Sequence, residues 1–300
     1  MKIVIAGGTG FIGQRLTQTL RQRDHEVVVL TRGRQTTTQR VAAVTWDAIH
    51  AEGAWVAEVR GADAVVNLAG ASIGGGRWTA SRKRLLIESR IRSTQALVDA
   101  VKATGRPVAL ITASGIDYYG NHPGAEALDE HAPAGTSFLA RLCVRWEEAA
   151  LQAEPLGMRV VRIRTAFCVG RGALALRLLA LPFRFFAGGP LGSGRQWFTW
   201  IHLEDLVNMY VLAIENADVH GPVNAVAPHV PCEREVARTI GRVLHRPASA
   251  PAPEFMLRLV LGDMADLLLH GRNAVPARAQ TAGFQFHYPE IDPALQEALT

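Results

Sequence analysis

Cysteine is scarce in this 300-residue sequence, which contains only three. Cys143, Cys168 and Cys232 are far apart, their number is odd, and no pair has the CxxC spacing of a metal site. This pattern argues against a disulfide framework and gives no sign of a metal ligand set. We therefore expect three reduced thiols in a cytoplasmic protein that binds no metal.

Long apolar runs are also missing. The most apolar stretch beyond the amino terminus, 174–187, is interrupted by Arg177, Pro182 and Arg184 and is too short to cross a bilayer. The chain begins MKIVIAGG, a short apolar run that leads directly into glycines, so we expect a first strand there and not a signal peptide. No membrane partner is expected.

Lysine is nearly absent, because only three of the 32 Lys and Arg residues are lysines, although the formal net charge is +5. The basic residues are scattered. Their densest cluster, 82–84 with Arg90 and Arg92, is typical of a solvated helix face, so no nucleic-acid partner is expected. An anionic cofactor is an adequate partner for the surplus positive charge.

The sequence does contain an alternation of short apolar runs and longer segments with helical periodicity. This alternation is typical of repeated βαβ units around a buried parallel sheet. Six strands are expected at 2–6, 27–30, 43–46, 64–69, 109–114 and 159–163, and helices at 11–23, 79–103 and 138–153. The predicted fold is α/β, a doubly wound parallel sheet of the Rossmann type with a smaller carboxyl-terminal substrate lobe.

Beyond about residue 165 the composition changes, and glycine-rich and proline-rich segments become frequent. Helices are expected between these segments at 203–216, 233–244 and 254–270. We expect a nucleotide-binding domain at 1–230, of which 166–200 contributes to the substrate lobe, and a cap or substrate domain at 231–300. No low-complexity linker separates the two.

A glycine-rich turn follows the first strand, with Gly7, Gly10 and Gly13 at GxxGxxG spacing. In dinucleotide-binding folds the first glycine permits a tight turn, the second lets the backbone approach a pyrophosphate, and the third allows close packing of helix on strand. The helix amino terminus adds amide donors and partial positive charge. The residues expected to hold a pyrophosphate are Gly7, Thr9, Gly10, Phe11, Ile12 and Gly13.

The end of the second strand indicates which dinucleotide is bound. A site that prefers NAD presents a carboxylate about 20 residues beyond the glycines. Here Thr31 and Arg32 occupy that region, and a guanidinium suits a 2′-phosphate. The predicted cofactor is therefore NADP(H), and a surface arginine in a loop is the alternative interpretation of Arg32.

Two further segments are expected beside the cofactor. Leu68 and Ala69 end the fourth strand among small residues, where the backbone can pass close to the adenosine; a simple turn is the alternative. Arg90 lies in an inward-leaning row of the next helix that runs from Leu86 to Val101. Its charge either points to a phosphate or extends along the helix edge to solvent.

The motifs together resemble a known family. GGTGFIG, VVNLAG, ITASGIDYYG and WIHLEDLV are similar to the extended short-chain dehydrogenase/reductases. GSGRQWFTWIH, GPVNAVAP and GFQFHYPE are similar to their atypical NAD-dependent epimerase/dehydratase-like branch, the epimerase family proteins with a carboxyl-terminal cap. The resemblance covers essentially the whole chain. It implies that Arg90 and Cys168 are further cofactor contacts and that a homodimer can form through paired helices.

The catalytic pair of that family is missing. Its members use the Tyr of a YxxxK pair to exchange a proton with the substrate oxygen, and a Ser to position that oxygen. None of the four tyrosines here has a lysine four residues later. By alignment with the family pattern, the tyrosine position falls at or near Phe138 and the lysine position near Leu142, and neither side chain can transfer a proton.

Some candidate catalytic residues are still present. Ser114 ends the fifth strand, and the loop after it brings Tyr118 and Tyr119 near the same strand end. Ser114 and Tyr118 are the predicted catalytic residues, and the alternative is that both tyrosines only pack. Arg195 and His202 could contact the substrate, although His202 is explained equally well as the cap of the next helix.

These residues leave three functions to compare. The first is an oxidoreductase or epimerase that acts with NADP(H) on a small carbonyl or nucleotide-sugar-like substrate. The second, favoured by the missing pair, is an NADPH sensor or protein-interaction module without catalysis. The third is a hydrolase, because residues 70–74 match the GxSxG elbow; that elbow needs a helix immediately after Ser72, where GGGRW follows instead.

Overall fold

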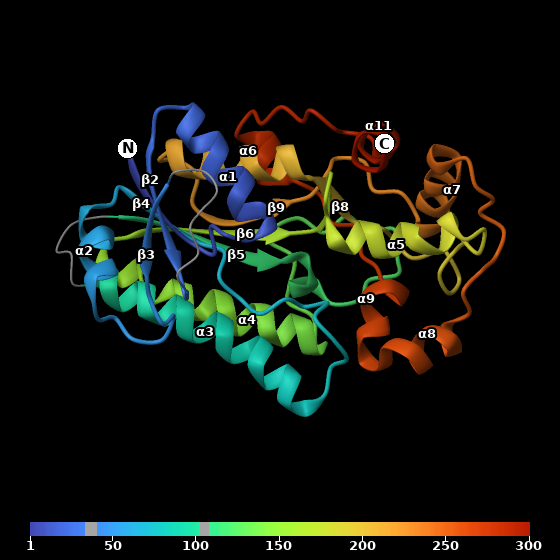
Figure 1. Cartoon of the computed structure of the whole chain (residues 1–300), viewed down its shortest axis with the longest axis horizontal. Helices are drawn as coiled ribbons and strands as arrows, with labels where there is room; N and C mark the ends of the chain where they lie inside the picture. Colours follow the sequence, from blue (N-terminus) through green and yellow to red (C-terminus); the bar gives the residue numbers. More distant parts are fainter. Residues whose placement is uncertain (34–40, 103–107) are drawn as a thin grey trace.

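The computed structural model describes residues 1–33, 41–102 and 108–300, and a parallel sheet lies at its centre (Figure 1). Its strands are β1 (Lys2–Ala6), β2 (Glu26–Thr31), β3 (Ala42–Thr45), β4 (Ala64–Asn67), β5 (Ala109–Gly115), β6 (Arg159–Thr165) and β9 (Gly221–Ala225). Their order is β3-β2-β1-β4-β5-β6-β9. Because the order reverses between β1 and β4, the carboxyl ends of these two strands form the topological switch point.

Both faces of the sheet are covered, which is why its strands are nearly continuous apolar runs. Ile3 and Ile5 belong to a core shared with α1 (Phe11–Gln22) and α6 (Leu203–Glu215). Val4, between them, belongs to a second core shared with α2 (Ala54–Gly61) and α3 (Ala80–Lys102). Alternate side chains of one strand thus supply both cores. α4 (Phe138–Leu151) runs beside α3 (Figure 1).

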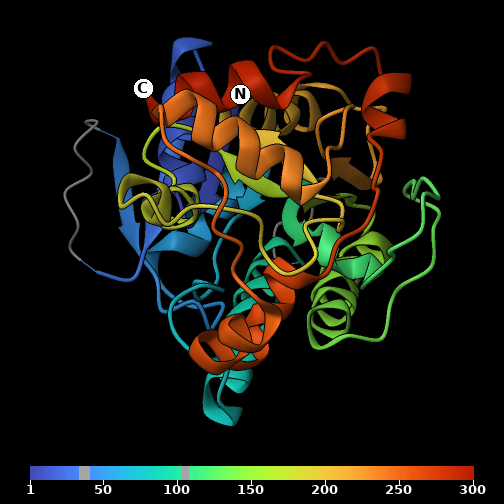
Figure 2. The ribbon, with the colours of Figure 1, turned by 90° about the vertical axis from the view of Figure 1, so that its right-hand side faces the viewer.

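The carboxyl-terminal part forms a second lobe. β7 (Phe167–Val169) and β8 (Trp200–His202) form a two-stranded parallel sheet. Around it, α5 (Leu174–Arg184), α7 (Glu233–Leu244) and α11 (Ile291–Leu299) share a third core. Figure 2 shows α7 on this side of the molecule, together with α8 (Glu254–Leu261) and α9 (Asp266–Leu269). The shorter elements are η1 (Ile116–Tyr119), η2 (Glu154–Leu156), η3 (Gly262–Ala265) and α10 (Ala277–Thr281).

The structure confirms the predicted fold class and differs from the prediction in several elements. β9 and α2 were not predicted, because GPVNA begins with turn residues and α2 is short. The fourth strand ends at Asn67, so Leu68 and Ala69 lie in the loop after it. The predicted helix at 254–270 is wrong as one element, since Gly262, with a φ of +60°, ends α8. The last residue of the predicted helix 79–103 lies outside the described residues.

Several expected absences concern the described residues. No helix among them is long and apolar enough to cross a membrane. In the same ranges, no group of three or more His, Cys, Asp and Glu residues is arranged to hold a metal ion. The three cysteines, all within the described ranges, are free.

Candidate functional site

The glycine turn joins the end of β1 to the start of α1. Gly7 has a φ of +82°, and a Cβ there would lie 2.8 Å from the carbonyl carbon of Leu68, so only glycine fits. A Cβ on Gly13 would overlap the carbonyl oxygen of Gly7. The two glycines therefore allow α1 and the loop after β4 to approach the strand more closely than side chains would permit.

The first turn of α1 offers unpaired amides. Gly10 is the N-cap of this 12-residue helix, and no side chain caps it. The first backbone N–H groups of a helix have no partner within the helix, and they carry its partial positive charge. Thr9 and Ile12 are half-buried beside the turn, whereas Phe11 is exposed. This arrangement suits an anion.

The residues predicted to hold a 2′-phosphate end β2. Thr31 is buried, and its hydroxyl donates to the carbonyl oxygen of Gly33 at 3.2 Å. Its own carbonyl oxygen accepts from the amide of Trp46 at 3.0 Å. Arg32 is exposed and forms no ion pair with a described residue. Its guanidinium is therefore available to an anionic ligand at the edge of the site.

The loop after β4 lies against the glycine turn. Asn67 is fully buried; its Nδ2 donates to Thr94 Oγ1 at 2.8 Å, and its Oδ1 accepts from the amide of Ala69 at 3.1 Å. The amide of Leu68 donates to the carbonyl oxygen of Ala6 at 2.8 Å. These bonds fix Leu68 and Ala69 beside the turn, half-buried, where the sequence predicts the adenosine side of the site.

Arg90, on α3, is a buried charge without a counter-charge. The residue is 7% exposed; its Nη1 donates to the carbonyl oxygens of Ala71 at 3.1 Å and Leu86 at 3.0 Å. Nε has no partner, and no carboxylate of the described chain pairs with the group. Burial lowers the pKa of Arg90 to about 10. The guanidinium lies against Gly70, so it faces the loop after β4 and does not extend to solvent.

Ser114, at the end of β5, is bonded to a buried carboxylate. Its Oγ donates to Glu147 Oε1 at 2.7 Å. Glu147, on α4, also accepts from Arg164 at 2.8 and 2.9 Å and from Arg162 at 3.1 Å. Burial opposes the charge of Arg164, but the hydrogen bonds and charge of Glu147 outweigh it and hold the pKa of Arg164 above its ordinary value. Because the hydroxyl hydrogen of Ser114 is directed to Glu147, its lone pairs remain for a ligand.

The two tyrosines of η1 have different environments. Tyr119 is fully buried; its hydroxyl donates to Asn224 Oδ1 at 2.7 Å and accepts from Arg164 at 2.9 Å. Burial raises the pKa of Tyr119 to about 12. Tyr118 is half-buried, its ring centre lies 3.5 Å from the guanidinium carbon of Arg164, and its hydroxyl has no hydrogen-bond partner in the described ranges. Tyr119 is therefore structural, and the phenol of Tyr118 remains for a ligand.

The positions of the missing catalytic pair lie in the first turns of α4. Ser137 caps this helix by accepting from the amide of Ala140 at 3.1 Å. Phe138 is half-buried and contacts Trp78 edge-to-face, with ring centres 5.4 Å apart. Leu142 is buried. Both positions contribute to an apolar cluster and neither bears a proton donor.

His202 and Arg195 do not meet at the site. His202 is buried and caps α6, because its Nδ1 accepts from the amide of Glu204 at 3.3 Å. Its Nε2 lies 3.2 Å from Glu297, and its ring stacks on Tyr288. The helix-cap interpretation of His202 is confirmed. Arg195 is exposed and forms no ion pair with a described residue.

Cys168, which the family resemblance adds as a cofactor contact, lies in β7 opposite Ile201 of β8. It is half-buried and packs against the core that α1 and α6 share with the sheet. Burial raises the pKa of its thiol to about 12. The thiol is neutral near pH 7, so Cys168 can contact a ligand only as a small apolar group.

Sequence reasoning missed the charged residues that organise the strand ends. Arg162 and Arg164 alternate along β6, which places both on one face of an otherwise apolar strand. Two arginines on a covered face require a carboxylate, and this signal predicts a partner such as Glu147. The ion pair between Asp117 and Arg272, at 2.7 Å, joins residues 155 apart and has no comparable signal in the sequence.

The hydrolase interpretation is wrong. Ser72 is exposed in a loop, and the next helix, α3, begins only at Ala80. The GxSxG elbow requires the helix to start directly after its serine so that the hydroxyl stands at a strand end. Residues 70–74 therefore form a glycine-rich loop without that geometry.

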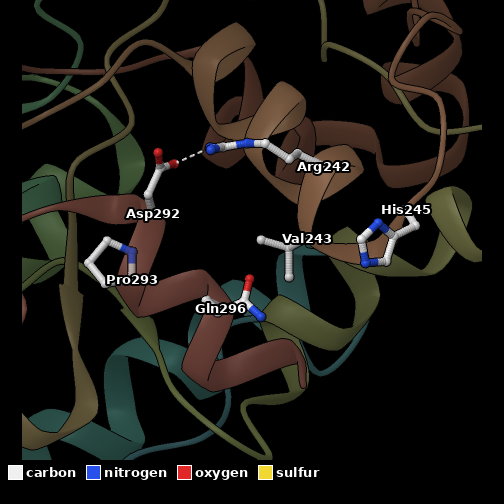
Figure 3. A pocket seen from close by; sticks show the side chains of 6 residues that line it. All are labelled: Arg242, Val243, His245, Asp292, Pro293 and Gln296. Atoms are coloured by element: carbon white, nitrogen blue, oxygen red, sulfur yellow. Dashed lines mark ion pairs between the residues drawn. The ribbon is translucent and has the colours of Figure 1, made fainter.

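An open surface depression of about 380 Å³ lies between α7 and α11 (Figure 3). Its lining residues are Arg242, Val243, His245, Asp292, Pro293 and Gln296. The two charged groups that face each other across it, Arg242 and Asp292, form an ion pair at 2.7 Å. None of the lining residues comes from a strand end of the central sheet, so the depression is separate from the candidate site.

Comparison with family models decides the family. Residues 3–226 match the NAD dependent epimerase/dehydratase family, and residues 252–298 match a domain of unknown function. The chain belongs to the NAD dependent epimerase/dehydratase family. The family resemblance of the motifs is thereby confirmed.

Curated relatives of this epimerase/dehydratase chain match over its whole length. The Epimerase family protein SDR39U1 homolog, chloroplastic, of Arabidopsis thaliana is 40% identical over 301 residues, with 99% of this chain and 86% of that protein covered. The Epimerase family protein YfhF of Bacillus subtilis is 38% identical, with 100% and 98% covered.

Solved structures agree. The crystal structure of human epimerase family protein SDR39U1 with NADPH has a TM-score of 0.89 and 36% identity, covering 99% of this chain and 98% of that one. A nucleoside-diphosphate sugar epimerase from Corynebacterium glutamicum has a TM-score of 0.78 and 30% identity, covering 100% of this chain and 58% of that one. The overall fold is thus that of these relatives.

Proposed function

We propose that this chain binds NADP(H) and transfers hydride to or from a carbonyl substrate, as an oxidoreductase or an epimerase. The observation that supports the cofactor most directly is the buried charge of Arg90 near the glycine turn, which no carboxylate of the described chain balances. A pyrophosphate would balance it and would meet the amides of α1. The NADPH in the crystal structure of the human relative supports the same cofactor here.

The residues present fit this cofactor. Those proposed for the pyrophosphate are Gly7, Thr9, Gly10, Phe11, Ile12 and Gly13, with Arg90. Thr31 and Arg32 would hold the 2′-phosphate, whose charge the exposed guanidinium matches. Leu68 and Ala69 would border the adenosine, and Cys168 would add a weaker contact. When bound, the cofactor supplies or accepts a hydride, and the chain's own residues orient the substrate and move the proton.

Ser114 and Tyr118 are the proposed catalytic residues. With its hydrogen directed to Glu147, Ser114 can accept a hydrogen bond from a substrate hydroxyl, which positions the alcohol form. Tyr118 can donate its phenolic hydrogen to a carbonyl oxygen. The guanidinium of Arg164 lies against its ring and holds the ring in place.

The remaining assignments follow from composition, motifs and family resemblance. We propose residues 1–230 as the cofactor domain, with 166–200 contributing to the substrate lobe, and 231–300 as the cap. The separate match of residues 252–298 supports this division. A cytoplasmic location, the possible homodimer and the lack of a nucleic-acid partner are proposals of the same kind.

Single-turnover oxidation of bound NADPH tests the proposal. The protein is loaded with NADPH, mixed with a panel of ketones, aldehydes and 4-keto nucleotide sugars, and followed by the absorbance of the reduced nicotinamide. We expect at least one compound to react, and we expect Tyr118→Phe or Ser114→Ala to slow that reaction about 100-fold. Tyr288→Phe, which removes a half-buried phenol packed against His202, is the matched control and keeps the rate.

A specific observation favours a second candidate, an NADPH sensor. Phe138 and Leu142 take the place of the proton-transfer pair, and the hydrogen of Ser114 is already committed to Glu147. If NADPH binds tightly and no compound of the panel oxidises it, the sensor function is supported and the oxidoreductase function fails.

A further inference from the structure

Five apolar side chains at the carboxyl end of β5 are only half-buried. We call them the apolar wall: Ile73, Tyr118, Phe138, Met264 and Leu267. They come from the loop after β4, from η1, from the start of α4, and from η3 and α9. Chain segments far apart in the sequence thus each leave part of an apolar side chain exposed on the same cluster.

The apolar wall is next to the proposed reacting position. Ala113, the chain neighbour of Ser114, packs on the same cluster. The sulfur of Cys143, a buried member of the cluster, lies 3.5 Å from the position of a Cβ on Gly115. Burial raises the pKa of the Cys143 thiol to about 12, so this side of Ser114 carries no thiolate. This side of Ser114 is therefore bordered by an apolar cluster without a charged thiolate.

Two ion pairs border the wall, and each is closed within the protein. Lys83 Nζ lies 2.6 Å from Asp263 and 5.1 Å from the ring centre of Phe138. Arg272 lies 2.7 Å from Asp117 at the other side. Each of these two cations is thus already paired, so neither has a free charge for a diphosphate.

The helix that precedes Met264 and Leu267 in the chain is also apolar and exposed. α8 directly precedes Met264 and contributes no buried residue. Phe255, Met256, Leu259 and Val260 on it are 51 to 75% exposed. Uncovered apolar side chains gathered in one segment are uncommon on a monomer and mark binding surfaces.

We propose that the substrate of this site has an apolar body, an aliphatic or aromatic hydrocarbon that carries the reacting carbonyl and covers the apolar wall. This inference rests on the proposed function, because it names the substrate class of the same site. Each methylene that the wall covers should tighten binding about fourfold. A nucleotide sugar would leave this surface covered by hydroxyl groups and gain nothing from it.

The test measures binding and not turnover. The protein is saturated with NADP+, so that no ketone is reduced, and titrated calorimetrically with a series of 2-alkanones from six to ten carbons. We expect the Kd to fall about fourfold per added methylene. UDP-glucose, added in excess, should not displace the longest ketone. A Kd that does not change with chain length, or displacement by UDP-glucose, would overturn the inference.

Two variants test whether the hydrocarbon chain of the ketone binds at the apolar wall. Leu267→Asn and Met264→Ser should each flatten the dependence on chain length while the affinity for NADP+ is kept, which shows that the fold is intact. Leu156→Asn, an exposed leucine of η2, is the matched control and should leave the dependence unchanged. An unaltered dependence in both wall variants places the hydrocarbon elsewhere and refutes the inference.

The outcome is distinguishable from a failure of the proposed function. If the protein binds no NADP(H), the proposed function fails before any ketone is tested. If ketones bind with the expected dependence but none oxidises NADPH, the apolar recognition stands and the oxidoreductase function fails. If only 4-keto nucleotide sugars oxidise NADPH, the oxidoreductase function stands and the apolar substrate is refuted.

Discussion

At the level of single side chains, the two buried arginines of the site are balanced in different ways. Arg164 is held by both oxygens of Glu147, whereas Arg90 has only two carbonyl oxygens as acceptors. A buried cation without a counter-charge destabilises the folded chain until an anion arrives. Cofactor binding and folding stability are therefore coupled through Arg90.

Replacing Arg90 separates a binding role from a structural one. In Arg90→Met we expect the free energy of unfolding of the cofactor-free protein to change by less than about 1 kcal/mol, because the lost hydrogen bonds are offset by the removed desolvation penalty. The Kd for NADPH should rise at least about tenfold. Urea unfolding and fluorescence titration measure the two quantities.

Arg164→Met is the matched comparison. It leaves Glu147 buried without its principal cation, and should lower the free energy of unfolding by about 3–5 kcal/mol. A large loss of stability in Arg90→Met together with unchanged NADPH affinity would show that Arg90 is structural.

Arg32 is predicted to discriminate between the two coenzymes. In Arg32→Asp the charge-assisted bonds to the 2′-phosphate are lost and a repulsive charge replaces them, so the Kd for NADPH should rise about 100-fold or more. The Kd for NADH should change little, and both are measured by titration. Arg177→Asp makes the same change of net charge on the exposed part of α5 and should alter neither. Equal losses for both coenzymes would refute the role of Arg32.

At the level of elements, α7 begins with a buried carboxylate. Glu233 is 3% exposed, and its Oε2 accepts from the amide of Leu191 at 2.9 Å. Burial raises the pKa of Glu233 to about 7, above its ordinary value. Between the two values the folded chain binds a proton that the unfolded chain has released. The stability contributed by protonated Glu233 is thus complete below about pH 4.5 and is lost as the pH rises to about 7.

Removing this charge should change how stability depends on pH. We expect Glu233→Gln to be more stable than the parent by roughly 2 kcal/mol at pH 8 and nearly equal to it at pH 4.5. Urea unfolding at the two pH values measures the difference. Glu235→Gln, an exposed carboxylate of the same helix, should show no such dependence on pH. An identical offset of Glu233→Gln at both values would contradict the assignment.

The elements show what the sequence could predict. The strands from β1 to β5 are largely apolar runs, so the doubly wound parallel sheet follows from their pattern, and the glycine turn follows from the GxxGxxG spacing. β9 escaped prediction because Gly221 and Pro222 are turn residues, and only its neighbour β6 makes this segment a strand. The break of the helix at Gly262 also escaped, because a glycine inside apolar periodicity does not reveal its φ. Local signals thus decide the central elements, and tertiary pairing decides the others.

At the level of the whole molecule, an ion pair joins the second lobe to the segment that follows β5. Arg272, 8% exposed, pairs with Asp117 in η1, next to the candidate catalytic residues. In the site, the partners of Ser114, Tyr118 and Asp117 come from distant parts of the chain, and the sequence offers no rule for pairing them. The glycine turn could be predicted because it lies in one local motif, whereas these partners could not.

Removing one partner of the ion pair between Asp117 and Arg272 should destabilise the fold more than removing both partners. Asp117→Asn leaves Arg272 buried without a counter-charge and should lower the free energy of unfolding by about 2 kcal/mol. Adding Arg272→Met should restore most of that loss, because the unpaired charge is then gone. Urea unfolding of both single variants and the double variant measures the coupling. Strictly additive losses would show that the two residues do not stabilise each other.

The exposure of α8 has a consequence for how the sequences of such proteins diverge. Since this helix places no side chain in any core, substitutions along it meet little resistance from folding, whereas the crowded glycines at the opposite end of the site tolerate none. Mutation can therefore explore new ligand preferences in one short segment while coenzyme chemistry stays fixed. A lineage that duplicates this gene would be expected to acquire its novelty there first.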